Sequence, residues 1–415
     1  MNRDRFIFDA ALDSTEKPSA DRDTTGTQPW LIRRVLAQIV CGRLTVVLPS
    51  GRTINHFGQQ PGPHGIMELR SGRAFRRLLS RGDVGFAEGY IAGDWTSPDL
   101  TALIAMAAQN AARLDRILEG FAPIRLWRCL SHALKRNSAR GSRKNITFHY
   151  DLGNAFYRLW LDASMTYSSA CSIAPGQSLE AAQQAKLERI TELLDLDWAM
   201  DVLEIGCGWG ALATRMGSHG ARVKGLTLSH EQLAWAERHV AEAGLAKGVD
   251  LRLQDYRHET GRYDRIVSIE MLEAVGEAYW PVYFEKLAEC IRPRGRIVLQ
   301  AITIREDRFA SYKRNPDFIQ RYIFPGGMLP TVAMLRGQAE AAGLAVVAQE
   351  TFAEGYADTL AAWRGRFEAA WPQIALQGFS AEFRRLWTYY LSYCEAGFRS
   401  GTIDVGLYVL EPQRR

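Results

Sequence analysis

The feature that most limits the fold of this chain is an apolar run that breaks into three glycines at alternate positions. It reads Val202-Leu-Glu-Ile-Gly-Cys-Gly-Trp-Gly210 and leads into a helix-like segment. Alternate glycines let the backbone turn through conformations that other residues avoid, and the helix that follows presents free amide groups to a ligand. The spacing Gly-x-Gly-x-Gly differs from the one that favours a dinucleotide pyrophosphate. The run therefore predicts a strand, a tight turn and a nucleotide-type cofactor site.

Strand-like and helix-like segments alternate regularly after this turn. Strands are expected at 202–205, 222–228, 249–254, 263–270 and 295–302, and helices at 179–194, 211–217, 231–243, 279–291 and 332–342. This βαβ periodicity predicts an α/β fold with a doubly wound, Rossmann-like parallel sheet that binds its ligands at the carboxyl ends of the strands. A helical, aromatic tail is expected to complete the chain.

The residues that end the next two strands indicate which cofactor the turn holds. A dinucleotide-binding enzyme usually has an acidic residue at the end of the second strand, for the ribose. Here Gly225-Leu-Thr-Leu-Ser229 ends that strand, and Gln232 follows. The third strand ends in Gln254-Asp-Tyr-Arg257, where Asp255 could accept a hydrogen bond from an adenine amino group beside Tyr256. Among Rossmann-like options S-adenosylmethionine fits best, and NAD is a distant second.

Composition divides the 415 residues into four regions. Residues 1–28 are rich in Asp, Ser and Thr and are predicted to be disordered. Residues 29–120 outline a small α+β domain with a hairpin about Pro49-Ser-Gly51. Within it a strand is expected at 66–69 and helices at 74–79 and 100–111. Residues 121–147 form a basic linker, and residues 148–415 are predicted to be the catalytic domain.

Positive charge is concentrated between Ile124 and Lys144. No acidic residue occurs there, whereas seven basic residues are interleaved with Leu, Ala and Trp127 at helical spacing. Such a basic amphipathic segment suits an anionic phospholipid surface. A solvated helix followed by a flexible linker is an equal alternative.

Other classes of protein are disfavoured by what the sequence lacks. No apolar run reaches the roughly 18 residues of a membrane span, and the first residues lack the apolar stretch of a signal peptide. A cytoplasmic protein, associated peripherally with the inner face of the membrane, is therefore expected. The cysteines contain no Cys-x-x-Cys pair, so neither a disulfide framework nor a metal site is predicted. The basic run is short and has no readout motif, which makes nucleic acid an unexpected partner.

Five separated blocks resemble the cyclopropane-fatty-acyl-phospholipid synthase family. They are residues 148–168, 202–210, 269–280, 322–330 and 389–399, in the order that the family has them. The resemblance implies a class I S-adenosylmethionine-dependent methyltransferase with a small N-terminal domain and helical lid or acyl-binding additions. It also implies methyl transfer to the double bond of unsaturated acyl chains in membrane phospholipids. The acyl position, the head group and the formation of a homo-oligomer stay open.

The resemblance also assigns cofactor-binding residues. They are Tyr167, Ser168, Glu204, Gly206, Gly208, Thr227, Gln232, Gln254, Asp255 and Tyr256. A purely structural role is the alternative for each of them. Thr227 and Gln232 could cap a helix, and Tyr167 could be part of the core.

Methyl transfer to an alkene leaves a carbocation, which must then lose a proton. Aromatic rings can stabilise such a cation without trapping it. In the family that Val202 to Gly210 and the other blocks resemble, a bound bicarbonate takes the proton. Backbone amides and Glu, His and Tyr side chains hold this bicarbonate. Carried over, the Glu is Glu273, the Tyr is Tyr356, and the residue that contributes its backbone is Ser169. Gln300 stands where the family has His.

Gln300 is the departure that bears on the product. A glutamine can hydrogen-bond an anion or a water, but it cannot relay a proton as imidazole can. Ala274 also stands where a His commonly follows the loop Glu. We therefore expect a methyl- or methylene-branched product, with a true cyclopropane synthase as the alternative. A methyltransferase of small molecules and a non-catalytic lipid-binding protein are less favoured.

Overall fold

The computed structural model describes residues 28–114 and 152–413. The predicted disordered N-terminus and the basic segment at 124–144 therefore lie outside the described residues, apart from residue 28. The chain forms two compact units, one made of Met1–Leu130 with Arg364–Ser400 and the other of Ser131–Trp363 with Gly401–Arg415.

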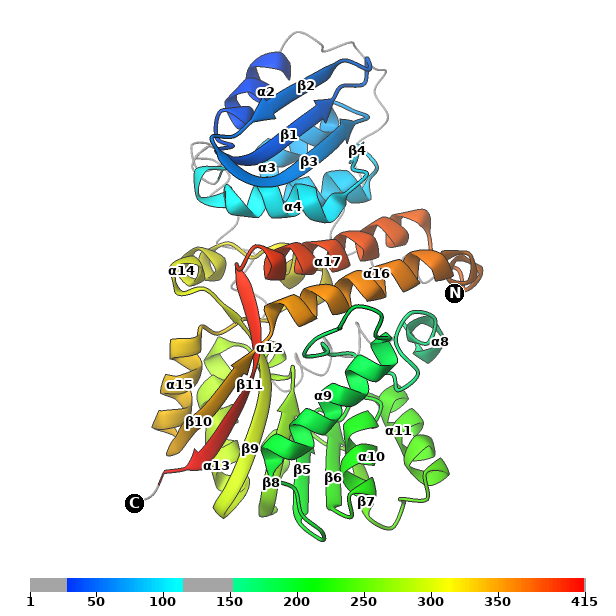
Figure 1. The fold of residues 1–415 in the computed structure, drawn as a ribbon, viewed down its shortest axis with the longest axis vertical. Helices are drawn as coiled ribbons and strands as arrows, with labels where there is room; N and C mark the ends of the chain where they lie inside the picture. Colours follow the sequence, from blue (N-terminus) through cyan, green and yellow to red (C-terminus); the bar gives the residue numbers. More distant parts are fainter. Residues whose placement is uncertain (1–27, 115–151, 414–415) are drawn as a thin grey trace. The chain divides into compact units, whose positions relative to one another are not determined.

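The first unit contains a small mixed sheet with the strand order β2-β1-β3-β4. Its elements are α2 (Gln28–Leu36), β1 (Cys41–Val47), β2 (Thr53–Phe57), β3 (Gln60–Leu69), α3 (Arg73–Ile91), β4 (Trp95–Thr96), α4 (Leu100–Gln109) and α17 (Ala381–Arg399) (Figure 1). The predicted hairpin is confirmed: β1 and β2 pair antiparallel, and Gly51 turns the chain with φ 82°. The predicted strand at 66–69 is the end of β3, and both predicted helices form.

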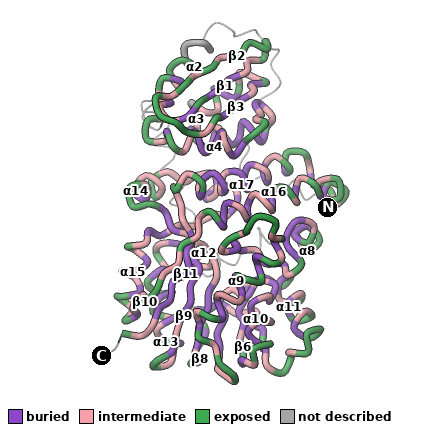
Figure 2. The backbone as a smooth tube through the Cα atoms, in the orientation of Figure 1, coloured by how far each residue is buried: buried purple, intermediate pink, exposed green. Residues whose placement is uncertain are grey.

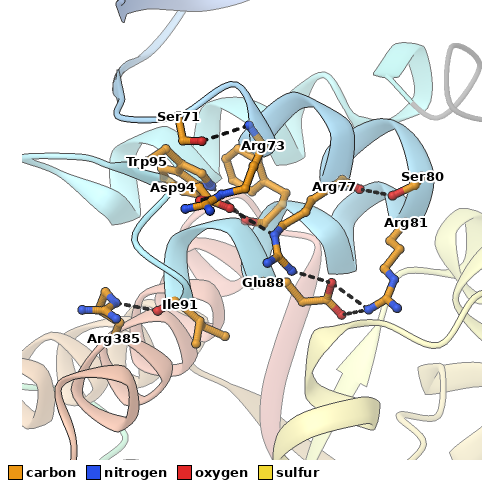
Figure 3. A network of polar contacts seen from close by, with 11 residues as sticks. Ser71, Arg73, Arg77, Ser80, Arg81, Glu88, Ile91, Asp94, Trp95 and Arg385 are labelled. Atoms are coloured by element: carbon orange, nitrogen blue, oxygen red, sulfur yellow. Dashed lines mark hydrogen bonds and ion pairs between the residues drawn. The ribbon is translucent and has the colours of Figure 1, made fainter. Parts of the chain in front are cut away.

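Two buried carboxylates stabilise α3 and the turn after it (Figure 3). Asp94, whose side chain is fully buried, accepts hydrogen bonds from Arg73 at 2.9 Å and Arg77 at 3.1 Å. Glu88 accepts two more from Arg81, at 2.8 and 3.0 Å. Because a buried charge without a partner is costly, these arginines are what allow the two acids inside the unit.

Helix α17 packs against α3 and α4 of the same unit. Thr101 on α4 donates to Glu395 on α17 at 3.0 Å, and both Arg364 and Arg399 pair with that carboxylate. Buried aromatic residues of α17 fill the interior, namely Phe383, Trp387, Tyr389, Tyr390 and Phe398. The residues Arg364–Ser400 therefore belong to the first unit and not with the rest of the predicted domain 148–415, because the N-terminal elements cover their apolar face.

The second unit is built on a seven-stranded sheet with the order β10-β11-β9-β8-β5-β6-β7. Its strands are β5 (Asp201–Ile205), β6 (Arg222–Thr227), β7 (Val249–Leu253), β8 (Tyr263–Ile269), β9 (Ile291–Ile304), β10 (Leu344–Thr351) and β11 (Ile403–Pro412). The five strands from β5 to β9 are parallel to their neighbours, whereas β11 is antiparallel to both β9 and β10. The predicted doubly wound α/β fold is confirmed.

Helices cover both faces of this sheet, and its inner strands are mostly buried between them, whereas the edge strand β10 is largely not (Figure 2). On one face lie α9 (Leu179–Leu194), α10 (Ala211–Ser218) and α11 (His230–Glu242), and on the other α13 (Trp280–Cys290) and α15 (Val332–Ala341). Successive residues of one strand point to opposite faces: Val202 belongs to the first apolar cluster and Leu203 to the second. This double burial explains the near-continuous apolar strands of the sequence.

Shorter elements connect these helices and strands. They are α8 (Asn154–Tyr157), the 3-10 turns η1 (Tyr256–His258) and η2 (Glu277–Tyr279), α12 (Leu272–Val275), α14 (Glu306–Arg314), the π-turn η3 (Ile319–Ile323) and α16 (Ala353–Leu376). Helix α16 begins in this unit and continues into the other one from Arg364. No helix within 28–114 or 152–413 is long and apolar enough to cross a membrane.

The predicted helical, aromatic tail is confirmed as α16 and α17, but the prediction did not include the strands that flank these helices. Two strands, β10 and β11, lie there, and β11 inserts between β9 and β10. In β11 the run from Val405 to Leu410 is buried on both faces, so it shows no alternation of polar and apolar residues. A short apolar run of this kind cannot be distinguished from a buried helical segment by periodicity.

Candidate functional site

The glycine turn lies where the sequence placed it, between β5 and α10. Gly206, Gly208 and Gly210 all have left-handed φ values, 85°, 53° and 86°. A β-carbon at Gly206 would lie 2.5 Å from Cγ of Met271, so a side chain does not fit there. A β-carbon at Gly208 would meet no atom within 4 Å. The turn therefore leaves open space above its backbone at Gly208, as the close approach of a ligand requires.

Glu204, two residues before the turn, is a buried carboxylate with spare hydrogen-bonding capacity. The residue is only 3% exposed, and its Oε2 atom has no partner among the described residues. Burial raises the pKa of this carboxyl to about 8, although Lys186 acts in the opposite direction. A buried, unpaired carboxylate oxygen fits an ammonium group such as that of S-adenosylmethionine.

Thr227 and Gln232 meet at the end of β6, as predicted. Thr227 donates to Oε1 of Gln232 at 3.0 Å, and both residues are buried. The residue that caps α11 is neither of them but Ser229, whose Oγ accepts from the amide of Gln232 at 3.3 Å. Helix capping therefore does not account for the side chains of Thr227 and Gln232.

The residues after β7 are committed to contacts within the protein. Both carboxylate oxygens of Asp255 accept hydrogen bonds from Arg257, at 2.9 and 2.6 Å. These bonds outweigh burial and lower the pKa of Asp255. Gln254 donates to Glu259 at 2.9 Å, and Tyr256 is buried in the apolar core. The adenine contact assigned to Asp255 stays a prediction, and it requires this carboxylate to accept from adenine as well as from Arg257.

Ser168 and Lys186 form a second buried contact close to the strand ends. Nζ of Lys186 donates to Oγ of Ser168 at 2.7 Å, and Lys186 is only 1% exposed. Burial lowers the pKa of Lys186, while Glu270, Asp162 and Glu204 act in the opposite direction. Lys186 is thus a buried amine whose charged form is disfavoured by burial and favoured by these three acids.

The polar centre of the unit is the carboxylate of Glu270, directly after β8. Its Oε1 accepts hydrogen bonds from the amide of Ser169 at 2.9 Å and from Nε2 of Gln300 at 2.7 Å. Its Oε2 accepts from the hydroxyl of Tyr356 at 2.6 Å. Gln300 also donates to Oγ of Ser169 at 2.9 Å. The structure therefore brings together three of the four predicted catalytic residues, Ser169, Gln300 and Tyr356, around Glu270.

Glu273, the fourth predicted catalytic residue, lies on α12 beside this centre. Its Oε1 accepts from the amide of Ile302, and its Oε2 is a buried atom with no partner among the described residues. Burial and the neighbouring charge of Glu270 raise the pKa of Glu273 to about 8. Glu273 is consequently the protonated member of the pair at neutral pH.

Sequence reasoning missed Glu270 and Lys186. Glu270 was visible as an acidic residue at the carboxyl end of a parallel strand, the position where ligands of such sheets are bound. Lys186 gave no signal, since one lysine in a helix rich in Gln and Glu is typical of a solvent-exposed face.

Aromatic rings surround the same strand ends. The ring centroid of Tyr167 lies 5.4 Å from that of Tyr157, 5.6 Å from that of Trp160 and 5.4 Å from that of Trp363. The rings of Tyr356 and Trp363 meet edge to face at 6.4 Å. Tyr167 is thus part of an aromatic cluster, and π faces of this kind attract a positive charge.

Comparisons with known proteins agree with this arrangement. The model of the mycolic acid cyclopropane synthetase family matches residues 137–407. The tuberculostearic acid methyltransferase UfaA1 of Mycobacterium tuberculosis is 39% identical over 81% of this chain and 80% of its own length. The cyclopropane-fatty-acyl-phospholipid synthase of Escherichia coli is 36% identical over 80% of this chain and 84% of its own length.

Solved structures show the same likeness. The cyclopropane synthase MmaA2 of Mycobacterium tuberculosis is 30% identical, with a TM-score of 0.60 over 67% of this chain and 99% of that one. The mycolic acid cyclopropane synthase CmaA1 complexed with SAH and CTAB has a TM-score of 0.61, with the same identity and coverage.

Proposed function

Because this chain belongs to the cyclopropane-fatty-acyl-phospholipid synthase family of S-adenosylmethionine-dependent fatty-acyl methyltransferases, we propose that it methylates the double bond of unsaturated acyl chains in membrane phospholipids. The observation that carries the proposal is the Glu270 centre, a carboxylate with three donors placed at the strand ends beside the glycine turn. Methyl transfer to a nitrogen or oxygen of a small molecule passes through no carbocation, so it has no need of aromatic rings that stabilise one.

S-adenosylmethionine, when bound, supplies an electrophilic methyl group on a sulfonium ion. The open backbone at Gly208 and the unpaired oxygen of Glu204 support binding of this cofactor at the glycine turn. The protein must then hold the alkene in near-attack geometry, because an alkene is a weak nucleophile. The rings of Tyr167 and Trp363 would stabilise the carbocation that follows, without reacting with it. A carboxylate at the strand ends would accept the proton.

The predicted contact with the cofactor at Glu204 can be tested by calorimetry. We expect Glu204→Gln to weaken S-adenosylmethionine binding by about 10- to 100-fold, the loss typical of a charge-assisted hydrogen bond. Because burial raises the pKa of Glu204 to about 8, the wild-type affinity should rise with pH toward that value as the carboxyl ionises. In the variant this pH dependence should disappear. Glu237→Gln, on the exposed face of α11, is the control, and equal affinities of the two variants would contradict the assignment.

For the product we propose a methyl- or methylene-branched chain, with the cyclopropane as the alternative. Direct loss of a proton from the new methyl group closes a ring, whereas loss from the chain carbon next to the cation leaves a methyl-branched alkene. A 1,2-hydride shift from the methylated carbon to the cation, followed by loss of a methyl proton, leaves an exocyclic methylene. Gln300 cannot relay a proton as the His of the resembled family can, and Ala274 replaces a second His. The similarity to a tuberculostearic acid methyltransferase supports the same product class.

The product can be identified with a trideuterated methyl donor and an unsaturated phospholipid in vesicles. A methyl-branched alkene retains three deuterium atoms, whereas a cyclopropane or an exocyclic methylene retains two. NMR distinguishes the cyclopropane from the exocyclic methylene. We expect the branched products, and a cyclopropane product would contradict this assignment. Gas chromatography with mass spectrometry of lipids from expressing cells gives an independent reading.

The same assay tests our proposal that the protein works at the cytoplasmic face of the membrane. The basic residues between Ile124 and Lys144 support it, since anionic lipids attract such segments. Turnover should be faster on vesicles that contain anionic phospholipid than on neutral ones, and the difference should shrink as salt is added. Equal rates on both would contradict peripheral association through charge.

A further inference from the structure

We propose that the carboxylate of Glu270 is the proton acceptor of the reaction and stands in place of the bound bicarbonate that the family resemblance implies. This inference rests on the proposed function, since it assigns the base that receives the proton from the methylated acyl chain. It is carried by the geometry around Glu270, and it leads to an experiment in which dissolved bicarbonate is the variable.

The hydrogen-bond donors around Glu270 define the position as an anion site. Three donors from three separate parts of the chain converge on one carboxylate: the amide of Ser169, Nε2 of Gln300 on β9 and the hydroxyl of Tyr356 on α16. Hydrogen bonds of this number and length, 2.6–2.9 Å, are those that hold a negative charge inside a protein. The side chains of Ser169 and Gln300 are 0% and 1% exposed, so the donors have little access to water.

A bicarbonate ion does not fit this donor set. The backbone of Ser169, the side chain at position 300 and Tyr356 are the groups that the resemblance assigns to bicarbonate, and each of them already donates to Glu270. A second anion in contact with them would also lie against the carboxylate of Glu270. Two like charges in contact repel strongly in a poorly hydrated site. The carboxylate of Glu270 therefore occupies the position that the resemblance assigns to the bicarbonate.

The backbone directs Glu270 into this position. Its φ is 49°, in the left-handed region that residues other than glycine seldom adopt, at a cost of about 1 kcal/mol. Its amide donates to the carbonyl of Gln300 at 2.8 Å, which fixes the turn directly after β8. The residue as a whole is half-buried, while protein atoms enclose its carboxyl group. Backbone strain that is held by surrounding contacts is typical of functional positions.

The charges nearby leave the negative charge on Glu270 rather than on Glu273. Burial raises the pKa of both carboxyls, and the charge of Glu270 raises the pKa of Glu273 further, to about 8. Tyr356, Ser169, Lys186 and Gln300 all favour the ionised form of Glu270. Glu273 accepts from backbone amides but receives no contribution from Lys186, and it keeps the proton. Of the two carboxyls, Glu270 is therefore the one that is able to accept a proton.

The step balances with the groups present. The π electrons of the acyl double bond form the new C–C bond to the methyl carbon, and the C–S bond breaks with its electron pair going to sulfur. The resulting carbocation loses a C–H proton to Glu270, and the electron pair of that C–H bond forms the ring bond or the new double bond. Glu270 becomes a neutral carboxylic acid and then releases the proton to solvent, so no oxidant, reductant or bicarbonate is consumed.

Turnover on phospholipid vesicles with and without bicarbonate tests this proposal. In buffer freed of carbon dioxide the wild-type enzyme should keep its turnover to within about twofold, because its base is covalently attached. Glu270→Gln should lower turnover by about 10²- to 10⁴-fold, the usual contribution of a general base. Added bicarbonate should not restore it, since the amide fills the same space.

Glu270→Gly separates the loss of the base from a failure to fold. Glycine relieves the left-handed backbone and leaves the three donors without their carboxylate, so bicarbonate can bind them. In the absence of bicarbonate this variant should be as slow as Glu270→Gln, and added bicarbonate should raise its turnover by about tenfold or more. Glu285→Gln, on the exposed face of α13, is the control for the substitution itself. S-adenosylmethionine affinity measured by calorimetry should be the same in all of these variants.

The outcomes distinguish this inference from the proposed function. Turnover by the wild-type enzyme that depends on added bicarbonate, or a Glu270→Gln variant with near wild-type turnover, would overturn the role of Glu270 while leaving the methyltransferase proposal intact. A wild-type enzyme that binds S-adenosylmethionine but labels no phospholipid, with or without bicarbonate, would overturn the proposed function, and the inference with it.

Discussion

Replacing Lys186 with methionine is expected to lower the free energy of unfolding by about 1–3 kcal/mol, the cost of leaving a buried polar group without its hydrogen bond. Methionine has nearly the same length and can keep the apolar contacts of the lysine stem. What it removes is the amino group that donates to Oγ of Ser168 at 2.7 Å. The buried hydroxyl of Ser168 would then be left without this donor.

Urea unfolding followed by circular dichroism measures this difference. Lys247→Met, at an exposed position after α11, is the matched control and should change the stability by less than about 0.5 kcal/mol. A Lys186→Met variant as stable as this control would show that the buried hydrogen bond from Lys186 to Ser168 makes no net contribution to the free energy of unfolding.

Replacing Tyr356 with phenylalanine is expected to lower kcat by about 10²-fold, at the lower end of what general acid–base groups contribute. The hydroxyl of Tyr356 donates to Oε2 of Glu270 at 2.6 Å, so Tyr356 is a positioning residue that acts through Glu270. Phenylalanine keeps the ring beside Trp363, and S-adenosylmethionine binding should not change. The KM for phospholipid should also stay close to the wild-type value.

The pH profile of this variant separates its role from a merely structural one. The hydrogen bond from Tyr356 stabilises the ionised form of Glu270 and so lowers the pKa of that carboxyl. Its removal raises the pKa, and a base must be ionised to act. The rising, acid side of the kcat profile should therefore move to higher pH in Tyr356→Phe.

A control substitution shows whether that shift is specific. Tyr393→Phe, on α17 in the other compact unit, should leave both kcat and the pH profile unchanged. A Tyr356→Phe variant with a lower kcat and an unshifted profile would indicate that Tyr356 only packs against its neighbours.

The local pattern of the sequence was sufficient for the fold class. The alternation of strands and helices from residue 201 to residue 302, and the glycine turn after β5, depend on interactions between residues close in sequence. Strands buried on both faces and a turn that needs positive φ values leave clear signs in composition. The strands β10 and β11 were missed because they pair with distant partners: β11 pairs with β9, which lies about a hundred positions earlier in the chain, and β10 pairs with β11 rather than with a strand next to it in sequence.

The chemical centre was decided by the tertiary structure. Glu270 and Glu273 are three residues apart in the same motif, and the sequence assigned the catalytic role to Glu273. The left-handed turn at Glu270 brings its carboxylate to Ser169, Gln300 and Tyr356, which lie 101, 30 and 86 residues away along the chain. Contacts of such separation form only when strands and helices pack.

The burial of Lys186 could not be predicted from the local sequence either. Nothing in the helix from Leu179 to Leu194 distinguishes a lysine that faces water from one enclosed beside Ser168. The sequence by itself thus determined the sheet, the glycine turn and the family to which the chain belongs. Only the packing of α9, α12 and α16 at the strand ends decided which carboxylate holds the charge, because charge in a protein interior depends on every group that surrounds it.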